Sequence, residues 1–83
     1  MTIQPSLTLF STDACHLCDL AQQVLAQSNF NGQLLIADIV EQPQWFECYQ
    51  VRIPVLHCQG YELDWPFDVQ EVNSFLQQLS APL

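Results

Sequence analysis

Two cysteines one helical turn apart, at the point where an apolar run gives way to an amphipathic one, constrain this chain more than any other feature. Cys15 and Cys18 follow residues 7–10, whose apolar side chains predict a buried strand, and they open an amphipathic stretch, residues 17–25. This spacing places both sulfur atoms on one side of a helix start, where they can close a small disulfide ring. The unpaired N–H groups of a helix start favour a thiolate, the form of cysteine that attacks disulfides. The pattern is what dithiol redox chemistry requires.

The first helix and the second strand follow from apolar periodicity. The helix has one face that we expect to be buried, formed by Leu17, Leu20, Ala21, Val24 and Leu25. Residues 34–37 form a continuous apolar run of the kind found in strands covered on both faces, and we expect this strand to lie parallel to the first.

The second half of the chain predicts a short helix, a hairpin and a closing helix. Pro43 in a first turn begins the short helix. Residues 55–58 and 61–63, separated by Gln59-Gly60, predict an antiparallel hairpin, and Asp68 is placed to cap the last helix. The fold class is therefore α/β with the order β-α-β-α-β-β-α, a four-stranded mixed sheet with helices on both faces.

Composition limits the class of protein. A chain of 83 residues with 49% hydrophobic content predicts a single domain over residues 1–83. One basic side chain against nine acidic ones gives a formal net charge of −8, which argues against nucleic-acid binding. No apolar run approaches the roughly 20 residues of a membrane helix. The N-terminal residues lack the basic region of a secretory signal, so we expect no such signal. We therefore expect a cytoplasmic protein without a membrane partner. In that reducing compartment we expect the four cysteines to be catalytic, metal-binding or buried, and not to form structural disulfides.

The predicted order matches the thioredoxin fold in its minimal form, and the size resembles glutaredoxins. Residues 9–18, which contain Cys15-His16-Leu17-Cys18, and residues 53–56, which contain Ile53-Pro54, resemble a bacterial glutaredoxin-like family. The resemblance covers nearly the whole chain. It implies thiol–disulfide exchange with a disulfide-bearing protein or a small thiol.

The position of each cysteine in the helix predicts its role. Cys15, at the exposed end, is the expected nucleophile, and Cys18, a turn further in and more buried, is the expected resolving thiol. His16, when protonated, is placed to stabilise the Cys15 thiolate; alternatively it is an exposed spacer. Leu17, also inside the motif, is a candidate substrate contact.

Three residues before the third strand are further candidates for substrate binding. Pro54 resembles the cis-proline of the thioredoxin fold, and by that resemblance Ile53 offers its backbone N–H and C=O to a peptide or a glutathione-like ligand. Arg52 either reaches a substrate carboxylate near the dithiol or tethers a helix end at the surface.

The segment after the hairpin departs from the glutathione-using pattern. Residues 63–68 lack the Gly-Gly of that pattern and contain two acidic residues, Asp64 and Asp68, which repel an anionic peptide. This segment therefore disfavours glutathione, which stays an alternative co-substrate, and we expect no bound cofactor. Trp65 either forms an apolar lip near the dithiol or closes the core.

Other functions remain open at the level of the sequence. Cys48 and Cys58 are expected to be buried small hydrophobes, with a regulatory disulfide between them as the alternative. A redox-inactive domain of the same fold would serve as a binding or scaffold module. A metal or iron–sulfur carrier would need a second chain, because one C-x-x-C pair cannot close a metal site. We expect no metal site in the chain itself and expect a monomer.

Overall fold

The computed structural model, which describes residues 6–80, has the predicted order of elements with one addition. The chain runs through β1 (Leu7–Ser11), α1 (His16–Gln27), β2 (Leu34–Asp38), the 3-10 turn η1 (Ile39–Glu41), α2 (Pro43–Tyr49), β3 (Val55–Cys58), β4 (Tyr61–Asp64) and α3 (Val69–Ser80). The turn η1 is the addition. It begins where the Asp38 carboxylate accepts a 3.1 Å hydrogen bond from the Val40 N–H.

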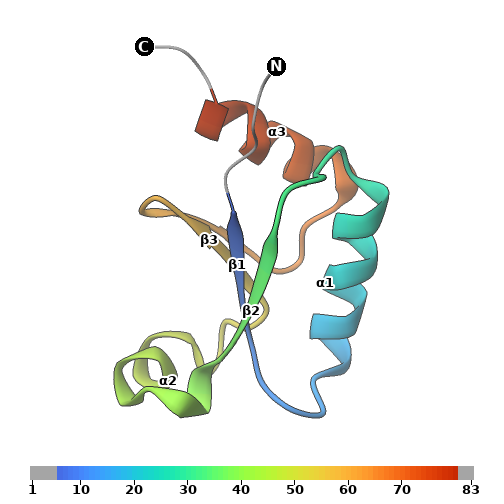
Figure 1. Ribbon diagram of the computed structural model, residues 1–83. Helices are drawn as coiled ribbons and strands as arrows, with labels where there is room; N and C mark the ends of the chain where they lie inside the picture. The colour runs from blue at the N-terminus through green and yellow to red at the C-terminus, as the bar shows by residue number, and fades with distance from the viewer. Residues whose placement is uncertain (1–5, 81–83) are drawn as a thin grey trace.

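The four strands form one mixed sheet in the order β2-β1-β3-β4. β1 and β2 are parallel, whereas β3 is antiparallel to both β1 and β4. Figure 1 shows α1 and α3 on one face of the sheet and α2 on the other. The expected fold class, including helices on both faces, is confirmed. Among residues 6–80, no helix is both long and apolar enough to cross a membrane.

Alternation along the central strands builds two apolar cores, because successive side chains of a strand point to opposite faces. Leu7 and Leu9 of β1 are buried against α1 and α3, whereas Phe10 points to the α2 side and stacks on Tyr49 with ring centroids 4.3 Å apart. Each such side chain contributes roughly 1.5–3 kcal/mol to folding by leaving water. The larger core comprises Leu7, Leu9, Ala21, Leu25, Leu56, Cys58, Phe67, Val72, Phe75 and Leu76.

The buried face of α1 is narrower than the sequence predicts. Its buried side chains are Cys18, Ala21 and Leu25, whereas Leu17 is 45% exposed. Position 17 lies about 100° around the helix from position 18, so it stands beside the buried stripe rather than within it. The expectation that Leu17 belongs to the buried face is wrong.

β2 is an edge strand, not a strand covered on both faces. Leu35 is 47% exposed and Ile36 is 51% exposed, because β2 pairs only with β1. A continuous apolar run fits a central strand and an apolar edge strand equally well, so the sequence pattern alone did not separate the two.

Local chemistry sets both the hairpin and the start of α3. Gln59 and Gly60 have φ angles of +54° and +86°, the signs that a two-residue type I′ turn requires. Asp68 accepts a 2.7 Å hydrogen bond from the Glu71 N–H, and Glu71 accepts a 3.2 Å bond from the Asp68 N–H. This reciprocal pair is a capping box, and the predicted cap at Asp68 is confirmed.

Candidate active site

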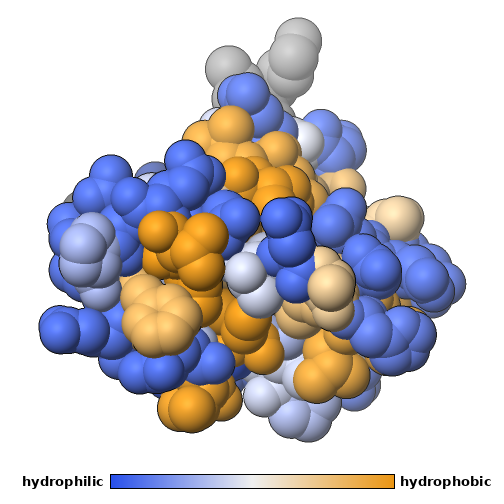
Figure 2. Space-filling view, turned by 90° about the horizontal axis from the view of Figure 1, so that it is seen from below, coloured by the Kyte–Doolittle hydropathy of each residue, from blue (hydrophilic) through white to orange (hydrophobic). Residues whose placement is uncertain are grey.

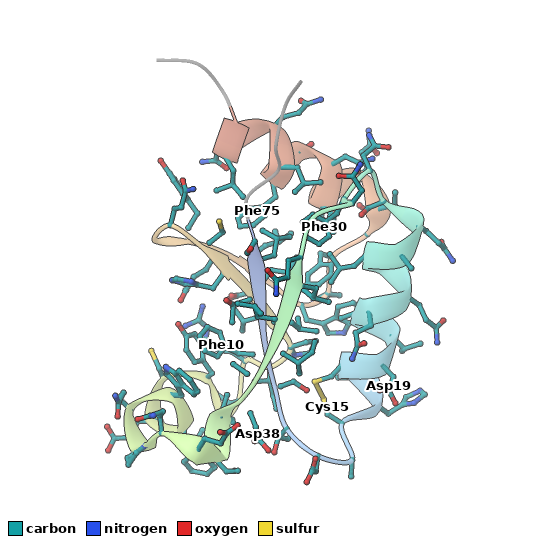
Figure 3. All side chains as sticks on the ribbon, in the orientation of Figure 1. Phe10, Cys15, Asp19, Phe30, Asp38 and Phe75 are labelled. Carbon is teal, nitrogen blue, oxygen red and sulfur yellow. A yellow bond between two sulfur atoms is a disulfide. The ribbon has the colours of Figure 1, made fainter. Side chains whose placement is uncertain are left out.

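The dithiol lies at the junction of β1 and α1. β1 ends at Ser11, the loop turns at Ala14 with φ at +58°, and Cys15 serves as the N-cap of α1. Cys15 and Cys18 are joined by a disulfide, with their Cα atoms 5.2 Å apart. Figure 3 shows this disulfide at the lower end of α1, on the side that faces the sheet.

The two sulfur atoms differ in exposure and in their relation to the helix start. Cys15 is half-buried, whereas Cys18 is only 2% exposed. The sulfur of Cys15 accepts a hydrogen bond of 3.2 Å from the Cys18 N–H, one of the first N–H groups of α1. A sulfur at this position receives the partial positive charge of the helix start, which favours its anionic form once the disulfide is reduced. The expected order of burial is confirmed.

The Ile53–Pro54 peptide bond is cis, as the resemblance implied. Phe10 pairs with Val55, so Pro54 lies beside Ser11, where β1 ends and the loop to Cys15 begins. Pro54 is fully buried, and its carbonyl accepts a 3.2 Å hydrogen bond from the Trp65 N–H. The register therefore brings this proline to the dithiol end of the sheet.

Ile53 differs in one respect from what the resemblance implied. Its N–H is already donated to the Tyr49 carbonyl at 3.0 Å, because the chain turns tightly after α2. The N–H is therefore not free for a ligand in this conformation. Among the loop and turn hydrogen bonds of residues 6–80, none ends on the Ile53 carbonyl.

Arg52 is held by the hairpin. Its guanidinium lies 2.6 Å from Glu62 and 2.8 Å from Asp64, and it stacks 5.1 Å from the centre of the Tyr49 ring. Hydrogen bonds to the two carboxylates raise the pKa of Arg52, so it stays charged. Of the two interpretations, the structure favours a surface tether, although the partner is β4 rather than a helix end.

The remaining candidates fall into two groups. His16 and Leu17 are exposed on the first turn of α1. Trp65 is half-buried, packs against the larger core and makes an edge contact with Phe67 at 5.0 Å. Core closure therefore accounts for the Trp65 ring, while its backbone anchors Pro54.

The other two cysteines are free thiols with different environments. Cys58 is buried in the larger core, and burial raises the pKa of its thiol. Cys48 is exposed on α2, so the expectation that it is buried is wrong. It neighbours Tyr49, whose ring occupies the buried face of that short helix. Because Cys58 and α2 lie on opposite faces of the sheet, the alternative of a Cys48–Cys58 disulfide has no structural support.

The sequence missed a polar network on the α2 face of the sheet. Tyr49 donates a 2.6 Å hydrogen bond to Glu62, which Arg52 also binds. The alternation of side chains along β4 could have indicated this network, since it places Glu62 and Asp64 on one face of the sheet. A second cis peptide bond, between Trp65 and Pro66, was also missed.

Within residues 6–80, no group of three or more His, Cys, Asp or Glu side chains is arranged to hold a metal ion.

Comparison with known proteins identifies the family. Residues 6–77 match the model of the Glutaredoxin-like domain (DUF836). The chain is also similar to the X-ray structure of Northeast Structural Genomics target protein XcR50 from X. campestris, with 40% identity over 92% of this chain and 99% of that one, and a TM-score of 0.80. The solution structure of the same target gives 39% identity over 94% and 97% of the two chains, also with a TM-score of 0.80. The chain therefore belongs to the glutaredoxin-like domain family, as the resemblance of its motifs indicated.

Proposed function

We propose that this protein is a thiol–disulfide oxidoreductase that uses Cys15 and Cys18 to reduce or exchange disulfides. The observation that carries the proposal is the Cys15–Cys18 disulfide at the start of α1, with one sulfur accessible and the other enclosed. Family membership supports a redox role in general. The geometry supports the assignment of the two roles.

The reaction starts from the reduced dithiol. The Cys15 thiolate attacks one sulfur of a substrate disulfide, forms a mixed disulfide and releases the other substrate sulfur as a thiolate, which takes up a proton. Cys18 then loses its proton and attacks the Cys15 sulfur, which re-forms the Cys15–Cys18 disulfide and releases the second substrate thiol. The protein dithiol has given up two electrons and two protons, and the substrate disulfide has gained them. A separate dithiol returns the protein to its reduced form.

The differing exposures fit this order of attack. Cys18, enclosed beneath the first turn of α1, is reached from within the molecule and not by a bulky substrate. Cys15 is accessible and lies at the helix start, where a thiolate is stabilised. The free Ile53 carbonyl beside Pro54 offers an acceptor for the backbone of an extended substrate. We further propose that the protein acts as a monomer in the cytoplasm, where a reducing compartment maintains the dithiol.

A redox titration with matched variants tests the proposal. Wild-type protein is equilibrated with mixtures of reduced and oxidised dithiothreitol, and the fraction of Cys15–Cys18 disulfide is measured by alkylation and mass spectrometry. Reduction of 2-hydroxyethyl disulfide, a neutral substrate, is measured in parallel. We expect one reversible two-electron transition, and turnover that Cys15→Ser abolishes.

The variants separate the two roles. Cys18→Ser is expected to stop at the mixed disulfide on Cys15, which mass spectrometry detects. Cys48→Ser, at an exposed cysteine of α2 on the opposite face of the sheet from α1, is the control and should keep wild-type turnover. If Cys15 and Cys18 never pair, or if Cys15→Ser turns over like the wild type, the proposal is wrong and the redox-inactive binding role remains.

A further inference from the structure

The chain has a single Lys or Arg side chain, Arg52, and its guanidinium is already paired with carboxylates of β4. Both Glu62 and Asp64 bind Arg52, at 2.6 Å and 2.8 Å. One positive charge against two negative charges leaves this triad with a net charge of −1 at neutral pH. The group that could have received a substrate carboxylate therefore lies in a locally negative environment, which repels anions.

Three acidic residues lie at the same end of the sheet as the dithiol. Asp13 lies in the loop between β1 and Cys15, and Asp19 lies in the first turn of α1, where its N–H is 3.3 Å from the Cys15 carbonyl. Asp38 ends β2 and pairs across the sheet with Ser11, where that loop begins. Figure 3 shows Asp19, Cys15 and Asp38 along this end of the molecule. We call Asp13, Asp19 and Asp38 the acidic rim.

Apolar side chains are interspersed with the rim. Leu17 is exposed two residues after Cys15, and Val40 is exposed two residues after Asp38. Figure 2, which views this end of the molecule, shows apolar surface in several areas separated by polar side chains. A complementary substrate carries positive charge together with apolar side chains.

We propose that the dithiol acts on disulfides in cationic polypeptide segments and discriminates against anionic disulfides such as glutathione disulfide. The inference rests on the proposed function and names its substrate class. The cysteine chemistry is the same two-electron exchange, while the charge of the substrate sets how often a productive encounter with Cys15 occurs. Clefts of one sign of charge change association rates by roughly 10- to 1000-fold, and the effect falls with ionic strength because salt screens exposed charges beyond about 10 Å. Each half of glutathione disulfide carries two carboxylates and one ammonium group, so it is repelled.

The test uses two synthetic disulfide peptides of one sequence, with lysine in one and glutamate in the other on either side of the cysteine. Rate constants for their reduction by the reduced protein are measured under single-turnover conditions at low and high salt. Each is divided by the rate constant of the same peptide with dithiothreitol, which removes differences in intrinsic reactivity. We expect the lysine peptide to react about tenfold faster or more at low salt, and we expect the ratio to fall several-fold at high salt.

Matched variants assign the effect to the rim. The double variant Asp13→Asn with Asp19→Asn should shrink the preference for the lysine peptide at least about threefold at low salt. Asp68→Asn is the control, because it removes one charge at the start of α3, away from the dithiol end, and asparagine caps a helix as well as aspartate. It should leave the preference unchanged.

The neutral 2-hydroxyethyl disulfide separates failure of this inference from failure of the proposed function. If the protein reduces it but reacts equally with both peptides, or faster with glutathione disulfide than with the lysine peptide, the charge selectivity is wrong and the oxidoreductase stands. If the neutral disulfide is not reduced at all, the proposed function fails, and this inference fails with it.

Discussion

Tyr49 donates a 2.6 Å hydrogen bond to Glu62, and this contact ties α2 to β4 across the face of the sheet. The Tyr49 ring also stacks on Phe10 of β1, and Arg52 binds the second oxygen of Glu62. The turn between α2 and β3, which carries Ile53 and Pro54, is thereby fixed to the hairpin on one side and to the core on the other. This network thus holds the cis-proline segment in place.

The Tyr49–Glu62 bond makes stability depend on pH in the alkaline range. Burial and the hydrogen bond to Glu62 raise the pKa of Tyr49 from 10.0 to about 12. A group whose pKa is raised on folding contributes stability that is present below its unfolded pKa and is lost as the pH rises through the folded value. We expect Tyr49→Phe to cost about 1 kcal/mol in urea unfolding up to pH 10, and the difference from wild type to shrink towards pH 12.

Tyr61→Phe is the matched control for the alkaline experiment, since Tyr61 is an exposed tyrosine on β4 outside the described contacts of the network. The Tyr61→Phe variant should lose stability above pH 10 as the wild type does, because it keeps the Tyr49 hydroxyl. A Tyr49→Phe difference that is constant from pH 9 to 12 would contradict the role of this hydroxyl.

Glu62 predicts the opposite dependence at acidic pH. Hydrogen bonds from Arg52 and Tyr49 hold the pKa of the Glu62 carboxyl below its usual value. Its contribution is therefore present above about pH 5 and is lost as the pH falls through the lower folded value. We expect Glu62→Gln to destabilise the protein by roughly 1 kcal/mol at pH 7, with the difference shrinking towards pH 3 in urea unfolding. Glu47→Gln on the exposed side of α2 is the control, and an equal cost at both sites would refute the network.

The sequence predicted those features that depend on neighbours along the chain. The order of the elements, the capping box at Asp68 and the turn at Gln59-Gly60 each follow from local periodicity or from the chemistry of a few adjacent residues. The dithiol was found for the same reason, because Cys15 and Cys18 are separated by one helical turn.

The features that the sequence missed depend on which distant segments meet. The apolar run of β2 is compatible with the centre or the edge of a sheet, and only the strand order decides which. The partners of Arg52 lie ten and twelve residues further along, on a strand whose register no local pattern fixes. The exposure of Leu17 and Cys48 likewise depends on which side of each helix meets its core.

The hairpin turn predicts two substitutions of opposite sign. Gln59, with φ at +54°, occupies a conformation that asparagine adopts more readily, so Gln59→Asn should stabilise the protein by about 0.5 kcal/mol. A Cβ on Gly60 would meet nothing within 4 Å, so Gly60→Ala causes no steric clash. Its cost in stability is that of holding alanine in a left-handed backbone conformation, about 1 kcal/mol. Urea unfolding of both variants checks the signs, and a stabilising Gly60→Ala would rule out the type I′ turn.

The two free cysteines should differ in reactivity. Cys48 is exposed, whereas Cys58 is buried and burial raises the pKa of its thiol, so Cys58 has less thiolate and less access to a reagent. With the Cys15–Cys18 disulfide intact, we expect iodoacetamide at pH 8 to modify Cys48 more than about tenfold faster than Cys58. Peptide mapping by mass spectrometry measures both rates, and the same experiment in urea should bring them together. Equal rates in the native protein would contradict the position of Cys58 in the core.

Leu9 and Ile36 face each other across β1 and β2 and should nevertheless differ in their contribution to stability. They are register partners on the same face of the sheet, but Leu9 is fully buried and Ile36 is 51% exposed. Leu9→Val and Ile36→Val each remove one methylene, which is worth about 1 kcal/mol in a closed core and a few tenths where water already reaches the side chain. The corresponding alanine variants should widen the gap, to about 2–5 kcal/mol at Leu9 against less than about 1 kcal/mol at Ile36. Urea unfolding at pH 7 decides it: equal costs at the two positions would mean that this face of β2 is closed to water in solution, contrary to the exposure of Ile36.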